Sequence, residues 1–387
     1  LPRFVSTDGH GGDEREFLKN YFSDLSSLLS MVFLKGYQWP FDVRKLKGSS
    51  LIDLLVYIET SKGRRVCLDF RDNPGLVKQI DFDSLIPEAK DYLRAAGAAF
   101  GTPVERLEAM NSPAFDFYRD RGVNLRKEPL EIALCAQHNN GGLAVDRHWQ
   151  SNIEGLFPVG EAAGTHGVYR PGGSALNAGQ AGSLRAARFI AREIRLEESS
   201  SHAKSVTLSG HLESLIAGIT GLAAAALSSG KDNAGQLIEE AGQRMSRCGA
   251  AFREGAQIRE ALELTKKLWD NFTGSAGVSQ AKDLFLFYRL RDMLFSQYLY
   301  LSAMADHIGR NAGSRGGALY YDPAGEKPLA SLPERFRYAI KEGTPLIQEI
   351  LYRNGVVSVS CREPRPIPET DEAFEKVWKD YRENRDT

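Results

Sequence analysis

The spacing of apolar residues predicts helices over most of the chain. In residues 49–60, leucine and isoleucine recur at three- and four-residue intervals, which places them on one face of a helix. Residues 76–126 show a similar pattern, which is interrupted by glycine and proline between residues 97 and 103. Helical spacing also extends over almost all of residues 206–310, and from Leu176 to Ile194. We therefore expect a mainly helical chain.

Four short segments predict strands instead. Residues 64–71 alternate apolar and polar side chains, which is typical of a half-buried strand. Continuous apolar runs predict buried strands at residues 132–135 and 156–159. Valines that follow an Asn-Gly turn signal predict a last strand at residues 356–359, ahead of a proline-rich tail that we expect to be extended.

Residues 156–194 show the most definite order of elements. The predicted strand leads into Gly160 and Glu161, a glycine-rich loop follows, and Gly172 and Gly173 precede the predicted helix. A helix that starts after such a turn leaves backbone N–H groups unpaired at the positive end of its dipole. This point of the chain can therefore hold a phosphate or another electron-rich group.

Length and charge limit the classes of function. A chain of 387 residues can bury a large core and form two or three structural units. Lys and Arg number 49 and Asp and Glu 50, so the net charge is -1 and no basic field is available for nucleic acid or an anionic membrane. The most apolar run, residues 215–227, is shorter than the roughly 20 residues that span a bilayer. We expect neither a nucleic-acid partner nor a membrane span.

The cysteine pattern indicates a reducing compartment. Four cysteines lie far apart in the sequence without a C-x-x-C pair. They are interpreted as reduced, buried thiols, which favours a cytoplasmic location and argues against an iron–sulfur site. The four are Cys67, Cys135, Cys248 and Cys361.

A series of short motifs between residues 138 and 176 carries a family resemblance. In chain order they are His-Asn-Asn-Gly-Gly, Gly-Glu and His-Gly-x-x-Arg-x-Gly-Gly-x-Ala-Leu. This order resembles the C-terminal flavin segment of the succinate dehydrogenase/fumarate reductase flavoprotein superfamily, which includes L-aspartate oxidase. The resemblance implies FAD as the cofactor and a small carboxylate-bearing substrate, with hydride transfer to or from flavin N5.

The resemblance also assigns the contacts to FAD. The glutamate of the Gly-Glu motif binds the ribityl chain, and the helix after the Gly-Gly turn points its N-terminus at the flavin N1/C2=O edge. A helix N-terminus favours the negative charge that collects there on reduction. No metal ligands are expected. The implied cofactor-binding residues are Gly160, Glu161, Gly172, Gly173, Ser174, Ala175 and Leu176.

Three side chains are the candidate catalytic residues. Arg170 occupies the position where the family clamps a substrate carboxylate, and a guanidinium fork suits a carboxylate bidentately. The family's substrate-binding histidine falls at Gln137, and His138 lies one place later. Either His138 has taken that role or the dicarboxylate site is altered, and the alternative is a histidine that only forms a local hydrogen bond. His166 matches a family histidine in the same loop as Arg170, with a purely structural hydrogen bond as the alternative.

The N-terminal part resembles the family's capping domain, the lid over the substrate. A glycine-rich stretch at residues 7–12 has the texture of a capping-domain motif, with an ordinary surface turn as the alternative. Asp13 after it is the predicted N-cap of a helix from Glu14 onward. Family members use a capping-domain arginine as proton donor. Arg44 and Lys47 lie near the corresponding place but do not match its motif, so we expect solvated charges there.

One family motif is absent from the sequence. FAD enzymes of this class hold the ADP half through G-x-G-x-x-G after an N-terminal strand, and these 387 residues contain no such fingerprint. The chain is therefore expected to correspond to the C-terminal portion of an FAD-dependent oxidoreductase. The alternative is a non-catalytic fragment or subunit, with a second polypeptide supplying the dinucleotide-binding half.

The predicted fold class is α/β plus all-α, in four parts. Residues 1–130 are a partial capping domain, and residues 131–198 are the C-terminal segment of an FAD-binding α/β domain. Residues 205–325 form a helical domain, and residues 326–387 form an extension with short strands and the proline-rich tail.

Overall fold

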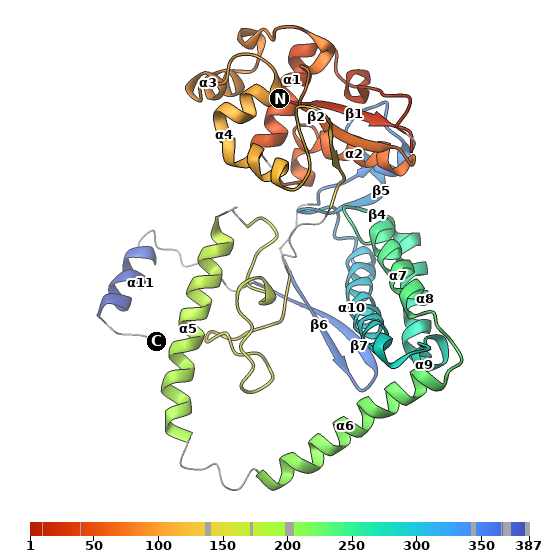
Figure 1. Ribbon diagram of the computed structural model, residues 1–387. Helices are drawn as coiled ribbons and strands as arrows, with labels where there is room; N and C mark the ends of the chain where they lie inside the picture. The colour runs from red at the N-terminus through yellow and green to blue at the C-terminus, as the bar shows by residue number, and fades with distance from the viewer. Residues whose placement is uncertain are drawn as a thin grey trace. The chain divides into compact units, whose positions relative to one another are not determined.

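The computed structural model of the chain is shown in Figure 1. It describes residues 1–9, 11–38, 40–135, 141–170, 173–197, 205–341, 346–364, 366 and 373–383. By its contacts the chain divides into two units, Leu1–Lys341 and Glu342–Thr387.

A three-stranded antiparallel sheet organises the N-terminal part of the first unit. Its strands are β1 (Arg3–Thr7), β2 (Arg65–Asp69) and β3 (Leu130–Ile132), in that order across the sheet. Val5 pairs with Cys67, and Cys67 pairs with Glu131 on the other side. The strand predicted at residues 64–71 is confirmed as the centre of this sheet.

Helices pack against the sheet as their apolar spacing predicts. Leu54 and Leu55 of α2 are almost completely buried, and the helix runs nearly to its predicted ends. In the next segment, a Thr102/Glu105 capping box starts α4 after the predicted break at glycine and proline. The helices of this part are α1 (Leu25–Tyr37), α2 (Ser50–Ser61), α3 (Pro87–Ala95) and α4 (Pro103–Asp120). Short 3-10 turns lie between them: η1 (Phe17–Asn20), η2 (Val43–Lys45), η3 (Pro74–Leu76) and η4 (Phe82–Ser84).

Three local predictions are wrong. Asp13 has a φ of 48° and caps no helix, because its neighbour Arg15 pairs with Ser6 and the first helical turn begins only at Phe17. Residues 156–159 run in irregular backbone, and they include a proline, which cannot donate to a ladder. The strand predicted at residues 132–135 is instead β3, which ends at its first residue.

The helical part of the first unit follows as predicted. Its core lies along α10, where Phe287 and Leu290 are fully buried, and α7 and α8 lie beside α10 (Figure 1). Two short strands pair in parallel, with Phe252 opposite Leu319. The elements are α6 (Ser205–Ser228), α7 (Ala234–Cys248), β4 (Phe252–Arg253), α8 (Gly255–Asp270), α9 (Phe272–Ser275), η7 (Ala281–Asp283), α10 (Leu284–Gly309), β5 (Leu319–Glu326) and η8 (Glu334–Phe336).

The last part of this unit returns to the N-terminal core. Phe252 and Phe336 pack in the same cluster as residues of α2, and the Tyr57 and Phe252 ring centroids are 4.4 Å apart. The mixed sheet-and-helix part followed by the helical part confirms the predicted fold class. The boundaries placed at residues 130, 198 and 325 stay predictions.

The second unit contains a hairpin and a helix. Strands β6 (Ile347–Arg353) and β7 (Val356–Arg362) pair antiparallel. Asn354 and Gly355 join them with φ of 51° and 82°, as a two-residue turn of this kind requires. The last predicted strand is confirmed as β7. Helix α11 (Ala373–Arg382) was not predicted, since an extended tail was expected here.

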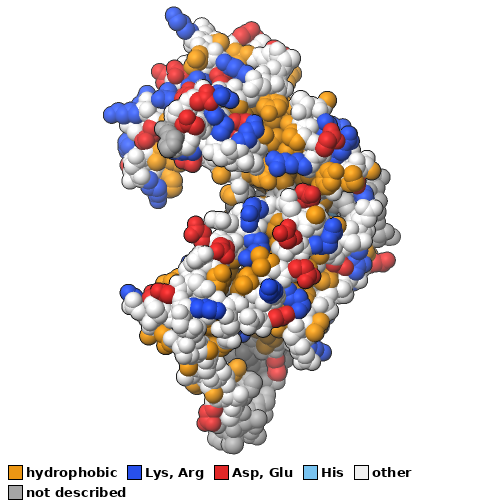
Figure 2. Space-filling model, turned by 90° about the vertical axis from the view of Figure 1, so that its right-hand side faces the viewer, with side chains coloured by type: hydrophobic (Ala, Val, Ile, Leu, Met, Phe, Trp, Pro, Cys, Tyr) orange, Lys and Arg blue, Asp and Glu red, His pale blue; other side chains and the backbone are white. Residues whose placement is uncertain are grey.

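The surface of the molecule carries charges of both signs. Lys and Arg side chains are interspersed with Asp and Glu on the face in Figure 2, as a net charge of -1 leads one to expect. Among the described helices, none combines the length and the apolar character of a membrane span.

All four cysteines are free, and burial raises the pKa of Cys67 and of Cys248. The expectation that all four are buried is wrong, because Cys135 is exposed and Cys361 is half-buried.

Candidate functional site

The start of α5 (Ser174–Glu197) is the centre of the predicted cofactor site. This helix of 24 residues carries no acidic side chain in its first turn, so nothing on the helix itself opposes an electron-rich group there. A Cβ added at Gly173, just before the helix, would meet nothing within 4 Å. Ser174 and Ala175 are half-buried, and Leu176 is 75% exposed.

A short turn beside α5 carries the predicted ribityl ligand. This turn is η5 (Gly160–Ala162), which contains Glu161 and starts at a φ of 65° at Gly160. The turn lies against α5, and a Cβ added at Gly179 would be 3.6 Å from the Cα of Gly160. Glu161 is exposed. The fold therefore holds its carboxylate near the first turns of α5 while leaving it accessible.

A backbone bridge fixes the position of this turn. The N–H of Leu143 donates to the carbonyl of Ala162 at 2.8 Å, and the N–H of Gly164 donates to the carbonyl of Leu143 at 2.8 Å. A Cβ added at Gly142 would lie 2.6 Å from the Ala162 carbonyl oxygen. Glycine is required at this position because two backbone segments meet there.

A second turn, residues 146–150, packs along α5. The Asp146 carboxylate accepts the N–H groups of His148 at 2.8 Å and of Gln150 at 2.9 Å, which closes the turn. The His148 ring then stacks on Phe189 of α5, with 4.4 Å between ring centroids. Together with the Gly160 contact, this stacking orients α5 relative to the segment before it.

The loop after η5 carries two of the candidate catalytic residues. His166 is buried, with 6% of its surface exposed, and Arg170 is half-buried. The Arg170 N–H donates to the Gly167 carbonyl at 3.2 Å, so the end of the loop turns back on itself. His138 and Gly172, also assigned to the site, lie outside the described residues.

Sequence reasoning missed several residues that shape this site. Gly142 was recognisable as part of the His-Asn-Asn-Gly-Gly motif, but nothing in the sequence indicated that it makes room for another backbone segment. Nothing in the sequence pointed to Trp149. In the structure it packs against α5, where a Cβ added at Gly182 would lie 2.5 Å from the Trp149 indole nitrogen. Nothing pointed to Asp146 either, because its role depends on the turn that it closes.

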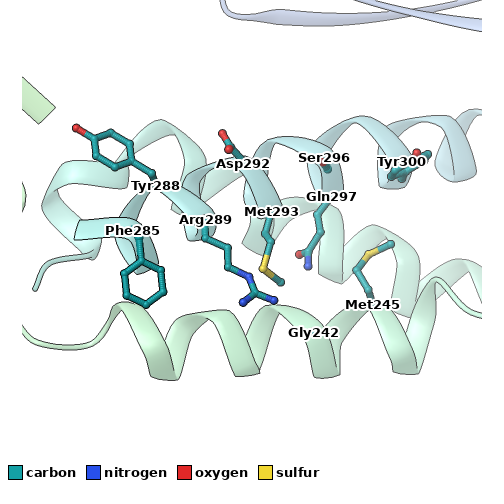
Figure 3. Close-up of a pocket in the computed structure, with 10 residues that line it drawn as sticks. All are labelled: Gly242, Met245, Phe285, Tyr288, Arg289, Asp292, Met293, Ser296, Gln297 and Tyr300. Atoms are coloured by element: carbon teal, nitrogen blue, oxygen red, sulfur yellow. The ribbon is translucent and has the colours of Figure 1, made fainter. Parts of the chain in front are cut away.

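A separate groove lies in the helical part. Figure 3 shows Phe285, Arg289 and Met293 of α10 directed toward α7, where Gly242 leaves open space. The groove has a volume of about 830 Å³ and contains none of the predicted site residues.

Comparison with known proteins agrees with the motif order. The family model "FAD binding domain" matches residues 56–176. One of the subunits of the fumarate reductase (CoM/CoB) of Methanothermobacter marburgensis is 37% identical over 103 residues, which are 26% of this chain and 18% of that protein. An L-aspartate oxidase of Pyrococcus horikoshii is 33% identical over 81 residues, 20% of this chain and 18% of that protein.

A longer match and a solved structure extend the likeness over most of the chain. The fumarate reductase flavoprotein subunit of Haemophilus influenzae is 24% identical over 238 residues, 59% of this chain and 37% of that protein. A quinol-fumarate reductase structure with menaquinol molecules has a TM-score of 0.61 at 16% identity, and it covers 96% of this chain. The chain spans 57% of the length of that structure.

These matches identify FAD as the cofactor. The described residues fit the flavin and ribityl parts of FAD: α5 begins without an opposing carboxylate, Gly173 leaves space, and Glu161 is accessible. Which residues contact FAD stays a prediction. The order of motifs, the family model, the relatives and the shared fold agree: the chain is similar to the flavoproteins of the succinate dehydrogenase/fumarate reductase superfamily.

Proposed function

We propose that this chain forms the substrate lid and the flavin edge of an FAD-dependent oxidoreductase that acts on a small carboxylate. The observation that carries the proposal is the contact between η5 and α5, which puts Glu161 beside the start of a helix with no acidic first turn. When bound, FAD supplies a hydride acceptor or donor at N5. The backbone N–H groups at the start of α5 stabilise negative charge at the pyrimidine edge.

Arg170 is the proposed clamp for the substrate carboxylate. It is half-buried in the loop between Glu161 and α5, so it lies between the two groups assigned to the flavin. A planar fork of N–H donors holds a carboxylate in one orientation, which keeps the reacting carbon at a fixed place. Buried His166, in the same loop, offers a ring nitrogen for a hydrogen bond to the substrate or to the loop itself.

The proposed substrate class follows from the relatives. Fumarate and L-aspartate, which give two groups of relatives their names, are both small dicarboxylates. We propose a substrate of this class, bound as an anion by Arg170 and by His138, which lies outside the described residues.

We further propose that the ADP half of FAD is bound by a dinucleotide-binding half outside this sequence, on the same or on a second polypeptide. The sequence has no G-x-G-x-x-G fingerprint, so its own residues offer no such site for the pyrophosphate. Several large apolar side chains of the segment around α5 are also exposed, and a protein surface would cover them. They are Leu143 (55%), Ile153 (60%), Leu176 (75%) and Leu184 (47%).

The same two observations favour a second candidate function. The chain is then a non-catalytic subunit, whose apolar surface binds another protein and whose site does not turn over. FAD titration separates the two candidates. The chain alone is expected to bind FAD weakly or not at all, whereas the chain mixed with the dinucleotide-binding half of a relative is expected to bind it and to show flavin absorbance. A mixture that stays colourless supports the non-catalytic subunit.

The clamp is tested in the reconstituted enzyme. Reduction of fumarate by a reduced dye, flavin content and melting temperature are compared for wild type, Arg170→Lys and Arg170→Ala. Losing a charge-assisted contact of the transition state costs on the order of 2–4 kcal/mol, or roughly 30- to 1,000-fold in turnover. Arg170→Lys keeps the charge but loses the fork, and is also expected to be impaired. If Arg170→Ala melts several degrees lower while its folded fraction turns over normally, the arginine is structural.

A further inference from the structure

Arg44 stacks on the residue next to the proposed clamp. Its guanidinium carbon lies 3.4 Å from the centroid of the Tyr169 ring, and Tyr169 immediately precedes Arg170. Arg44 belongs to η2, which comes before α2 in the N-terminal part, so the contact joins segments far apart in the sequence. A planar guanidinium over an aromatic face gains cation–π attraction as well as stacking.

Asp42 holds the Arg44 side chain in this orientation. The Asp42 carboxylate accepts hydrogen bonds from Arg44 Nε at 3.2 Å and from Arg44 Nη2 at 2.8 Å, and from the Arg44 backbone N–H at 2.9 Å. The Asp42 N–H in turn donates to Ser50 Oγ at the start of α2 at 3.0 Å. The bond to Asp42 raises the pKa of Arg44, so this side chain stays a cation and acts by position rather than by proton transfer.

A third segment completes the junction. The Gly316 N–H donates to the Tyr169 hydroxyl at 3.3 Å, and the Gly316 carbonyl accepts the N–H of Val43 at 2.9 Å. A Cβ added at Gly316 would lie 2.5 Å from Val168 Cγ1, and its φ of 54° also favours glycine. The face of the Tyr169 ring and its hydroxyl are thus held by two different segments, η2 itself and the Gly316 backbone that is bonded to it.

We propose that Arg44 is a positioning residue for the loop of residues 164–170. By stacking on Tyr169 it fixes the backbone that carries Arg170, and so sets where the guanidinium of Arg170 meets a substrate carboxylate. The second half of this inference rests on the proposed function, whereas the first half concerns the chain alone. Because η2 belongs to the N-terminal part, which is proposed as the substrate lid, this contact links the lid directly to the loop that carries Arg170.

Hydrogen exchange of the backbone amides in residues 164–170 tests the first half on the full chain without cofactor. A cation–π contact at an exposed site corresponds to an increase in exchange of about 2- to 5-fold when it is lost. This increase is expected for Arg44→Ala and for Tyr169→Leu. Tyr169→Phe keeps the ring, and it is expected to exchange more slowly than Tyr169→Leu. Arg44→Lys is expected to lie between wild type and Arg44→Ala.

Arg121 provides the matched control. Its guanidinium carbon lies 3.6 Å from the Phe117 ring centroid, so Arg121→Ala removes a stack of similar geometry away from the loop. This variant is expected to leave exchange in residues 164–170 unchanged. Unchanged exchange in Arg44→Ala, or an equal increase in Arg121→Ala, would overturn the proposal.

The second half is tested in the reconstituted enzyme. Arg44→Ala is expected to raise KM for the carboxylate substrate by about 2- to 5-fold, with kcat and flavin content nearly unchanged. In the Arg170→Ala background the same change is expected to add nothing, because the clamp is already gone. Faster exchange with an unchanged KM would overturn positioning of the clamp. Normal turnover of Arg170→Ala would overturn the proposed function instead, and the exchange data would still decide on the stack.

Discussion

Gly182 of α5 lies directly against the indole of Trp149, so that a Cβ at Gly182 would be 2.5 Å from the indole nitrogen. Trp149 itself adopts a φ of 65°, which is uncommon for a large residue. The neighbouring His148 ring stacks on Phe189, about two turns further along the helix. These contacts determine how α5 is rotated against the segment that carries Glu161. The predicted flavin edge therefore depends on a glycine and a tryptophan that lie outside the residues assigned to the flavin.

Two helical glycines are expected to respond to alanine with opposite signs. Gly182→Ala forces the Trp149 ring away and is expected to lower the free energy of unfolding by about 1–3 kcal/mol. A Cβ at Gly218 of α6 meets nothing within 4 Å, so Gly218→Ala is expected to raise this free energy by roughly 0.5–1 kcal/mol through helix propensity. Urea unfolding of both variants measures the difference. Equal effects would contradict the Trp149 contact.

A similar comparison tests the backbone bridge. Gly142→Ala places a methyl group 2.6 Å from the Ala162 carbonyl oxygen, and neither backbone segment can move without losing its hydrogen bonds. We expect a loss of about 1–3 kcal/mol in the free energy of unfolding, as for other overpacked sites. Gly167→Ala in the following loop has open space and serves as the control. A Gly142→Ala variant as stable as this control would show that the bridge is dispensable.

Gly173 separates cofactor binding from folding. Because its Cβ position is open in the chain itself, Gly173→Val is expected to leave the melting temperature nearly unchanged. In the reconstituted holoenzyme the added side chain would keep the first N–H groups of α5 away from the flavin, so the flavin content is expected to fall. Absorbance of the purified variant at flavin wavelengths gives the answer. Full, tightly bound flavin would argue against the placement of the cofactor at this helix.

The Arg3–Asp69–Arg71 cluster predicts a loss of stability in acid. Burial alone would raise the pKa of Asp69, but hydrogen bonds from Arg71 and Arg3 lower it to about 2. The unfolded carboxyl has a pKa near 3.9, so the cluster stabilises the fold above this pH and loses its effect as the pH falls from about 4 to 2. Its contribution is on the order of 2 kcal/mol at pH 7.

Asp69→Asn is the variant for this measurement. It is expected to be less stable than wild type at pH 7 and to approach wild type near pH 2, in urea unfolding at a series of pH values. The control is Asp83→Asn, because the Asp83 side chain is 67% exposed and its ion pair with Arg94 contributes little. A difference for Asp69→Asn that does not change with pH would rule out titration of this carboxyl as its cause.

Elements with their own local signal could be predicted from the sequence. Helix α2 has a complete apolar face, and β7 follows an Asn-Gly turn, so both were placed correctly. Strand β1 was not predicted, because Arg3 and Ser6 are buried alongside Phe4 and Val5 and no alternation is left to detect. Residues 156–159 show the opposite error, a strand that was predicted but is not formed. Their apolar run predicts a strand, but an apolar run without a pairing partner forms none.

The candidate site shows the same division. Gly160, Glu161 and Gly173 are candidates because they belong to motifs in a recognisable order, and their roles stay predictions. The pairs Trp149–Gly182 and Arg44–Tyr169 could not, because each joins residues whose contact depends on how distant segments pack. Gly142 lies between these cases: its motif was visible, but its close neighbour is the backbone near Ala163.

The bridge between Leu143 and Ala163 has a consequence for how this protein can vary. The bridge bonds the two ends of the segment between Leu143 and Ala163 to each other. Residues added in the middle of this segment therefore need not move Glu161, which lies close to its bonded end. The exposed turn at residues 152–155 is then a place where insertions cost little, since loop-closure entropy rises slowly with length. Homologous chains are expected to differ in length there, whereas the spacing from Ala163 to α5 should be kept.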